Sequence, residues 1–104
     1  MAMLETSNVN GQFFTGNVRL VHAVGMHARP AVKLTKLAKK FEAQISVRVA
    51  GAADWINAKS VAKIMAMRAA HGSIIEIKAF GGDAEAAVTA LVDLIATDFP
   101  DGTA

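Results

Sequence analysis

The chain has 104 residues, a length that suits one compact domain and is too short for two. Hydrophobic residues make up 53% of it, which excludes disorder over most of the length. It contains no cysteine, so a disulfide framework and a thiolate metal site are both excluded. The formal net charge is only +2, which is too small to indicate bulk binding to nucleic acid.

The two ends of the chain differ from its middle. Residues 1–16 carry Ser, Asn, Gly and Thr without a sustained period, and we expect them to form a mobile extension. Residues 17–100 are expected to form the single domain, and residues 101–104 a tail. The first ten residues lack the basic and apolar segments of a secretory signal, and no apolar run is long enough to cross a bilayer. We therefore expect a cytoplasmic protein.

Hydrophobic periodicity divides residues 17–100 into seven elements. Alternating apolar residues predict strands over 18–22, 45–49, 55–57 and 74–79. Spacings of three and four predict helices over 28–40, from Ser60 to His71-Gly72, and from Asp83 to Phe99. Ser60 and Asp83 are the predicted N-caps of the second and third helices, and Gly72 is the predicted residue after the second. Hairpins mixed with helical crossovers favour an α+β sandwich of two layers, with a mainly antiparallel sheet and the helices on one face.

The first helix is preceded by Gly25-Met26-His27-Ala28-Arg29-Pro30-Ala31. Glycine permits a left-handed turn before the histidine, and proline is tolerated in a first helical turn. The apolar residues Ala31, Leu34, Leu37, Ala38 and Phe41 place the start of the helix near Ala28. His27 is therefore predicted at or next to the N-cap.

This position gives His27 a chemical environment that suits an anion. The first amides of a helix point outward without partners, and the donors nearest His27 are those of Ala28 and Arg29. The positive helix end disfavours imidazolium, which predicts a neutral, nucleophilic ring. Arg29 adds a fork suited to phosphate oxygens. Together they indicate an imidazole that accepts a phosphoryl group, whereas the simpler alternative is a helix cap or a solvated side chain.

Other polar residues have competing interpretations. His22 lies five residues before His27, across a strand-to-helix turn, and we interpret it as a polar strand-end residue and not as part of a metal pair. A basic stripe on the first helix is either a solvated face or a surface for an acidic partner. It also supports an alternative function, a small nucleic-acid- or protein-binding adaptor. The stripe consists of Arg29, Lys33, Lys36 and Lys40.

The chain resembles the histidine-containing phosphocarrier protein (HPr) family of the phosphoenolpyruvate-dependent phosphotransferase system. The heptapeptide around His27 matches the phosphorylation site of that family, and Ala58-Lys59-Ser60 before a short helix is a second match. The resemblance covers about residues 17–99 and implies a four-stranded sheet in the order 1-4-2-3 with three helices on one face. The wording AVGMHARPAVKL is closer to the nitrogen-related branch than to sugar-import carriers.

The resemblance also implies a function. His27 would take a phosphoryl group on Nδ1 from enzyme I and pass it to a histidine of an enzyme IIA-type protein, while Arg29 holds the phosphoryl oxygens. Such a chain is a carrier and not a free-standing enzyme, and it needs no cofactor or metal. Since it presents one face to two partners, we expect a monomer.

The resemblance further implies a docking patch and a regulatory residue. The apolar residues after Ser60, namely Val61, Ala62 and Met65, would contact both partners, with Lys36 beside them. Ser60 matches the position that a dedicated serine kinase modifies in some family members. A phosphate there would place negative charge beside the patch and repel an acidic partner.

Overall fold

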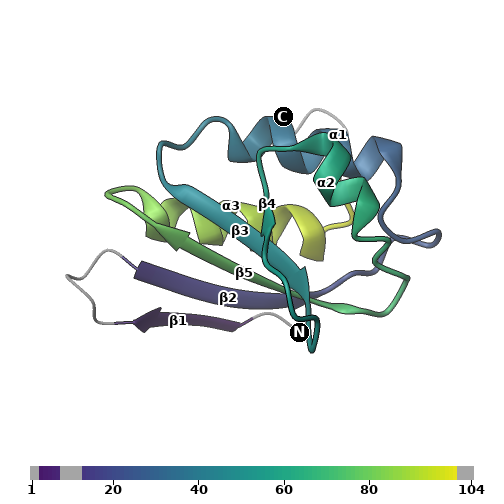
Figure 1. The fold of residues 1–104 in the computed structure, drawn as a ribbon, viewed down its shortest axis with the longest axis horizontal. Coiled ribbons are helices and arrows are strands. Elements are labelled where there is room, and N and C mark those ends of the chain that lie inside the picture. Colours follow the sequence, from purple (N-terminus) through teal and green to yellow (C-terminus); the bar gives the residue numbers. More distant parts are fainter. Residues whose placement is uncertain (1–2, 8–12, 101–104) are drawn as a thin grey trace.

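The computed structural model describes residues 3–7 and 13–100 (Figure 1). In this part of the chain five strands and three helices form two layers. The strands are β1 (Met3–Ser7), β2 (Phe13–Arg19), β3 (Gln44–Val49), β4 (Ile56–Asn57) and β5 (Ile74–Phe80). The helices are α1 (Ala28–Ala38), α2 (Val61–Ala66) and α3 (Ala84–Ala96).

The strands form one antiparallel sheet in the order β1-β2-β5-β3-β4. Within it, β2, β5, β3 and β4 reproduce the predicted order 1-4-2-3, so the expected α+β fold is confirmed. β2 pairs with β5 over its whole length, from Phe13 opposite Phe80 to Arg19 opposite Ile74. β5 therefore lies at the centre of the sheet, although it is the last strand in the chain.

The N-terminal segment differs from the mobile extension predicted over residues 1–16. Residues 3–7 form β1, which pairs antiparallel with β2 as a fifth strand at the sheet edge, and residues 13–16 already belong to β2. The amino-acid pattern here is weak, and the strand is specified by the free edge of β2, a tertiary partner that local periodicity does not reveal. Residues 1–2, 8–12 and the predicted tail at 101–104 lie outside the described residues.

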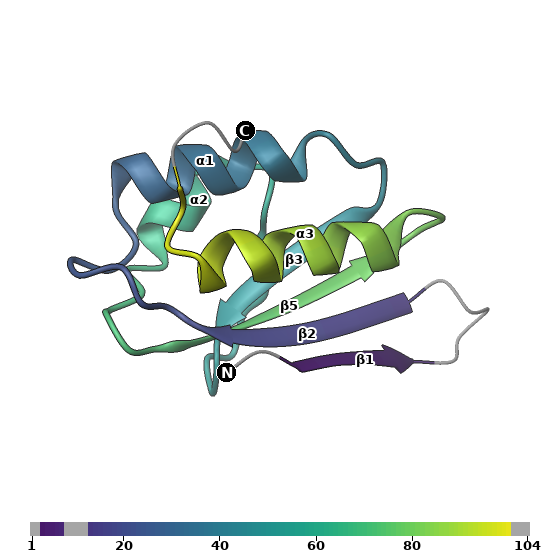
Figure 2. The same ribbon diagram turned by 180° about the vertical axis from the view of Figure 1, so that it is seen from behind.

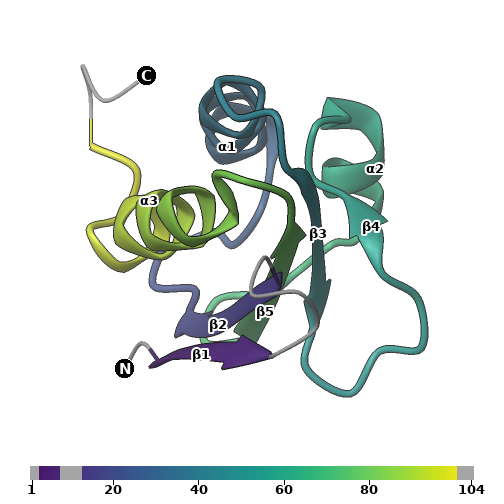
Figure 3. The same cartoon turned by 90° about the vertical axis from the view of Figure 1, so that its left-hand side faces the viewer.

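The three helices cover one face of the sheet, as the end-on view in Figure 3 shows. α3 packs on β2 and β5, while α1 packs between α2 and α3. Leu34 of α1 and Leu91 of α3 are fully buried in this layer. Complete burial of such a side chain stabilises the fold by about 1.5–3 kcal/mol. Because aromatic residues are scarce, small aliphatic side chains fill most of the core.

The second helix is shorter than predicted. α2 ends at Ala66, and Arg68 adopts a left-handed backbone (φ 53°) directly after its C-cap Met67. Gly72 (φ 90°) is therefore not the residue after the helix but part of the turn into β5. The segment from Arg68 to Gly72 leaves helical geometry because its backbone forms hydrogen bonds with the residues before α1. The Ala69 carbonyl accepts one of these bonds, and the Gly72 N–H donates another.

Asp83 occupies the N-cap position of α3 as predicted, but its side chain does not cap that helix. Its two carboxylate oxygens accept hydrogen bonds from the backbone N–H groups of Glu42 (2.9 Å) and Ala43 (2.8 Å). The carboxylate thus ties the start of α3 to the α1–β3 connection. These bonds, the one from Glu42 first, hold the pKa of Asp83 below its ordinary value of 3.8.

The lowered pKa of Asp83 predicts how stability depends on pH. Its contribution is present above 3.8 and is lost as the pH falls through the lower pKa of the folded state. We expect Asp83→Asn to reduce the free energy of unfolding at neutral pH, and this deficit to shrink in acid. Urea unfolding at neutral pH and below pH 3.8 measures both effects. Asp54→Asn, in an exposed turn, is the control, and an equal deficit for Asp83→Asn at both pH values would contradict the prediction.

Candidate functional site

Backbone hydrogen bonds position the loop between β2 and α1. Leu20 exchanges bonds with the turn before β5, donating to the Ser73 carbonyl and accepting from Gly72 N–H, each at 2.8 Å. Met26 N–H then donates to the Ala69 carbonyl at 2.8 Å. The loop that carries His27 is therefore held against the segment following α2.

Gly25 is required by this contact. Its backbone is left-handed (φ 76°), and a Cβ atom placed on it would lie 2.6 Å from the Ala69 carbonyl oxygen. Only glycine meets both conditions, because other residues would carry a strained φ and also push the two segments apart. The glycine that the sequence analysis assigned to a tight turn thus also allows a close backbone approach.

His27 is the N-cap residue of α1, as predicted. Its backbone is extended (φ −133°, ψ −162°), and its carbonyl accepts the Ala31 N–H at 2.9 Å. Its ring makes no capping hydrogen bond, so the imidazole is not used to close the helix. Pro30 has no N–H, and the amides of Ala28 and Arg29 belong to the first helical turn, whose N–H groups point outward from the helix end. The simpler alternative of a capping histidine therefore does not fit the geometry.

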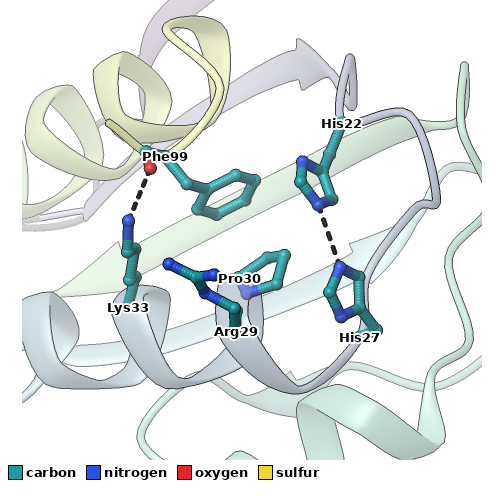
Figure 4. Close-up of a pocket in the computed structure, with 6 residues that line it drawn as sticks. All are labelled: His22, His27, Arg29, Pro30, Lys33 and Phe99. Carbon is teal, nitrogen blue, oxygen red and sulfur yellow. Dashed lines mark hydrogen bonds between the residues drawn. The ribbon is translucent and has the colours of Figure 1, made fainter. Parts of the chain in front are cut away.

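A cleft of about 320 Å³ opens beside this helix end (Figure 4). Half-buried His27 and exposed Arg29 lie on its α1 side, and Pro30 is buried beneath them. Two further walls come from the loop and from the chain after α3. The full lining is His22, His27, Arg29, Pro30, Lys33 and Phe99.

His22 is the residue that sequence reasoning placed incorrectly. It lies beyond the end of β2, and its ring is stacked on that of His27 with the ring centroids 4.9 Å apart. Their Nε2 atoms are 2.9 Å apart, as Figure 4 shows by a dashed line. On the other side of the ring, His22 Nδ1 is 2.9 Å from a carboxylate oxygen of Asp98. The site therefore contains a chain of three side chains, Asp98–His22–His27.

The segment after α3 closes the cleft. Figure 2 shows it rising from the end of α3 beside the first turns of α1. Asp98 and Phe99 both have left-handed backbones (φ 62° and 51°), and the Phe99 ring is buried near the edge of His22. Lys33 of the predicted basic stripe donates to the Phe99 carbonyl at 2.8 Å. This lysine thus anchors the closing segment, a role that neither interpretation of the stripe predicted.

The predicted regulatory and docking residues lie on α1 and α2, outside the cleft lining. Ser60 caps α2 as expected, with its hydroxyl oxygen accepting the Lys63 N–H at 3.3 Å. Met65 is 40% exposed, and Ala62 is exposed, whereas Val61 packs partly against the core. Lys36 is exposed on α1.

Two classes of feature are absent from the described residues. Over 3–7 and 13–100, no group of three or more His, Cys, Asp or Glu side chains could hold a metal ion. In that same part of the chain, no helix has the length and apolar character that a membrane span requires.

Comparison with known proteins decides the family. Residues 14–97 match the family model described as "PTS HPr component phosphorylation site". The chain belongs to the HPr phosphocarrier family of the phosphotransferase system. The family resemblance predicted from the heptapeptide and the Ala58-Lys59-Ser60 motif is confirmed.

Two relatives show how much of this HPr chain, and of each relative, the sequence similarity covers. It is 36% identical over 80 residues to the phosphocarrier protein HPr of Haloferax volcanii, covering 77% of this chain and 90% of the relative. It is 41% identical over 78 residues to a multiphosphoryl transfer protein of Vibrio cholerae, covering 74% of this chain but only 20% of that much longer protein.

Solved structures share the fold. The crystal structure of HPr-C-His from Thermoanaerobacter tengcongensis aligns with a TM-score of 0.75 at 36% identity, covering 82% of this chain and 93% of that one. The HPr structure from Bacillus anthracis aligns with a TM-score of 0.73 at 34% identity, covering 80% and 96% of the two chains.

Replacing Gly25 tests how tightly the loop is held. We expect Gly25→Ala to lower the free energy of unfolding by about 1–3 kcal/mol, because it adds a strained φ and a clash with the Ala69 carbonyl. Gly51→Ala is the matched control, since Gly51 is also left-handed (φ 90°) but has open space around it. Urea unfolding compares the two variants. Equal losses would show that the close approach to Ala69 contributes nothing.

Proposed function

We propose that His27 Nδ1 is the atom that carries the phosphoryl group in this HPr protein. One observation carries the proposal: a histidine stands at the N-cap of α1 without capping it, and faces a cleft that Arg29 also lines. The ring is accessible enough for a partner to reach, and the helix end supplies positive potential where the phosphoryl oxygens would lie.

The transfer needs a nucleophile and stabilisation of negative charge. The His27 Nδ1 lone pair forms the bond to phosphorus, while the bond to the donor's imidazole nitrogen breaks and leaves its electron pair there. In this proposal, the amides of Ala28 and Arg29 and the Arg29 guanidinium bind the equatorial oxygens during this step. The same groups then bind the phosphoryl oxygens when His27 donates the phosphoryl group to the next histidine. The protein thus provides positioning and charge stabilisation, and the two partners provide the donor and acceptor histidines.

Enzyme I is proposed as the donor and an enzyme IIA-type protein as the acceptor. Exposed apolar side chains in the loop before α1 and on α2 support this docking. Val24 in the loop is 70% exposed and Met65 is 40% exposed, and the loop is tied to the segment after α2 by the Met26–Ala69 hydrogen bond. The proposed docking surface also includes Ala62, Val61 and Lys36, on α2 and α1.

The cellular location, the oligomeric state and the family branch are part of the same proposal. We propose that the carrier is cytoplasmic, and a sequence without cysteine is consistent with that reducing compartment. A monomer presents the cleft to both partners most simply, although a solved HPr from Thermoanaerobacter tengcongensis that aligns with a TM-score of 0.65 is a dimer. Assignment to the nitrogen-related branch stays a prediction from the wording around His27. The family model and the relatives support the carrier, and none of them favours the alternative of a nucleic-acid- or protein-binding adaptor.

Phosphoryl acceptance tests the role of His27. Incubation with enzyme I and labelled phosphoenolpyruvate is expected to give an acid-labile, base-stable phosphoprotein, and His27→Ala to give none. We expect Arg29→Ala to slow labelling by about 10²-fold, because one charge-stabilising donor is lost while the fold is kept. Lys40→Ala removes the same charge from the far end of the stripe and should label at the normal rate. Label that survives in His27→Ala would refute the assignment.

Ser60 is tested by a pair of variants that both keep the helix cap. Asp and Asn are good N-cap residues, so neither Ser60→Asp nor Ser60→Asn should disturb α2. We expect Ser60→Asp to bind enzyme I about tenfold more weakly, equivalent to about 1.4 kcal/mol, because a negative charge then faces an acidic partner. Ser60→Asn should bind as the wild type does. Calorimetric titration measures both, and equal affinities for the two variants would exclude charge-based regulation at Ser60.

A further inference from the structure

We propose that His22 and Asp98 are positioning residues for the phosphoryl transfer, fixing the tautomer of His27 and taking up the proton charge that the transfer creates. This inference rests on the proposed role of His27 as the phosphoryl acceptor. It follows from the three side chains joined in series, with 2.9 Å from Asp98 Oδ1 to His22 Nδ1 and 2.9 Å from His22 Nε2 to His27 Nε2.

The carboxylate of Asp98 determines which atoms are donors along the series Asp98–His22–His27. An ionised carboxylate can only accept, so His22 Nδ1 must carry a hydrogen that it donates to Asp98. In a neutral His22 the other nitrogen, Nε2, is then a bare acceptor. His27 Nε2 must therefore carry the hydrogen of their shared bond, and His27 Nδ1 is left with its lone pair. The contact selects the tautomer of His27 whose Nδ1 is the nucleophile.

The same contact acts during transfer. When His27 Nδ1 bonds to phosphorus while Nε2 keeps its hydrogen, the His27 ring acquires positive charge. His22 Nε2 faces that hydrogen at hydrogen-bond distance and can share or take the proton. The Asp98 carboxylate then faces a positively charged His22, as a carboxylate does behind the histidine of a catalytic triad. On donation to the acceptor, the N–P bond breaks with its electrons returning to Nδ1, and the proton returns to His27 Nε2.

The backbone around Asp98 is built to hold this arrangement. Asp98 and Phe99 occupy two successive left-handed positions, which residues other than glycine adopt only where the surrounding structure holds them. Burial of the Phe99 ring and the bond from Lys33 to its carbonyl hold the turn in place. The His22 side chain is only 27% exposed, and the Phe99 ring meets it edge-on with centroids 6.1 Å apart. Water therefore competes less at Nε2, whose contact with His27 is partly buried, than it would at an open surface.

The competing interpretation is that His22 serves only as an aromatic packing partner for His27 and Phe99. His22→Phe separates the two, because it keeps a flat ring in the stack and removes both nitrogens. Asp98→Asn is the second variant, since asparagine tolerates a left-handed backbone and keeps the shape of the side chain. Asp93→Asn removes a carboxylate from the exposed face of α3 and is the matched control.

Nitrogen-15 NMR of the histidine rings in the unphosphorylated protein provides the first measurement. In the wild type, His27 is expected to show a protonated Nε2 and a bare Nδ1. In His22→Phe we expect a mixture of both tautomers, while Asp93→Asn keeps the wild-type signals. Packing alone predicts no change of tautomer in His22→Phe.

Labelling from enzyme I provides the second measurement. We expect His22→Phe to accept phosphate about 10²-fold more slowly than the wild type, the lower range for a positioned proton acceptor, and Asp98→Asn about tenfold more slowly. Asp93→Asn should match the wild type. A wild-type rate or wild-type ring signals in His22→Phe would overturn the inference, even if His27 is the labelled residue. Failure of the wild type to be labelled at His27 would instead refute the proposed function, while the NMR measurement would still report the tautomer.

Discussion

The hydrogen bond from Met26 N–H to the Ala69 carbonyl fixes the loop that carries His27. It holds the β2–α1 loop against the segment that follows α2, and it requires the left-handed Gly25 whose missing side chain lets the backbones approach. That segment leads directly into β5, the central strand. The backbone of the loop before His27 is therefore anchored, through this segment, to the middle of the sheet. A loop residue thus acquires the rigidity of the scaffold, which is what a transfer reaction between two separate proteins needs.

The His27 ring has two different environments on its two nitrogen sides. Nε2 is engaged by His22 and, through it, by the carboxylate of Asp98. The helix end contributes outward amides and the nearby Arg29, groups that favour negative charge. The first environment offers an acceptor for the Nε2 hydrogen, and the second favours binding of the phosphoryl oxygens. One side chain can therefore act as a nucleophile and as a leaving group without a change in the surrounding fold.

The parts of this structure that were predictable from the sequence are those with a local signal. The Gly25-to-Ala31 segment contains its own turn, cap and helix start, so the N-cap position of His27 followed directly. The four-strand order and the helices came from hydrophobic periodicity together with the family resemblance. β1 could not be predicted in this way, because its pairing depends on an edge supplied by β2. The same is true of Asp83, whose carboxylate was expected to cap its own helix and instead binds the backbone of Glu42 and Ala43.

His22 shows the same limit within the site. Its distance of five residues from His27 was considered only as a metal-ligand spacing, and the turn at Gly25 brings the two rings into contact instead. Asp98 carried no signal at all, since its approach depends on two left-handed residues after α3.

The contact between Asp98 and His22 spans 76 positions of the chain. Closing so large a loop is entropically expensive, and the contact exists only while the end of α3 is in place. The last turn of a helix is also where a native protein opens most readily, at a free energy well below that of global unfolding. Fraying of this one turn would release the His22 ring while the sheet and α1 stay folded. In the proposed arrangement, the tautomer of His27 thus depends on the local stability of a helix end that lies far away in the sequence.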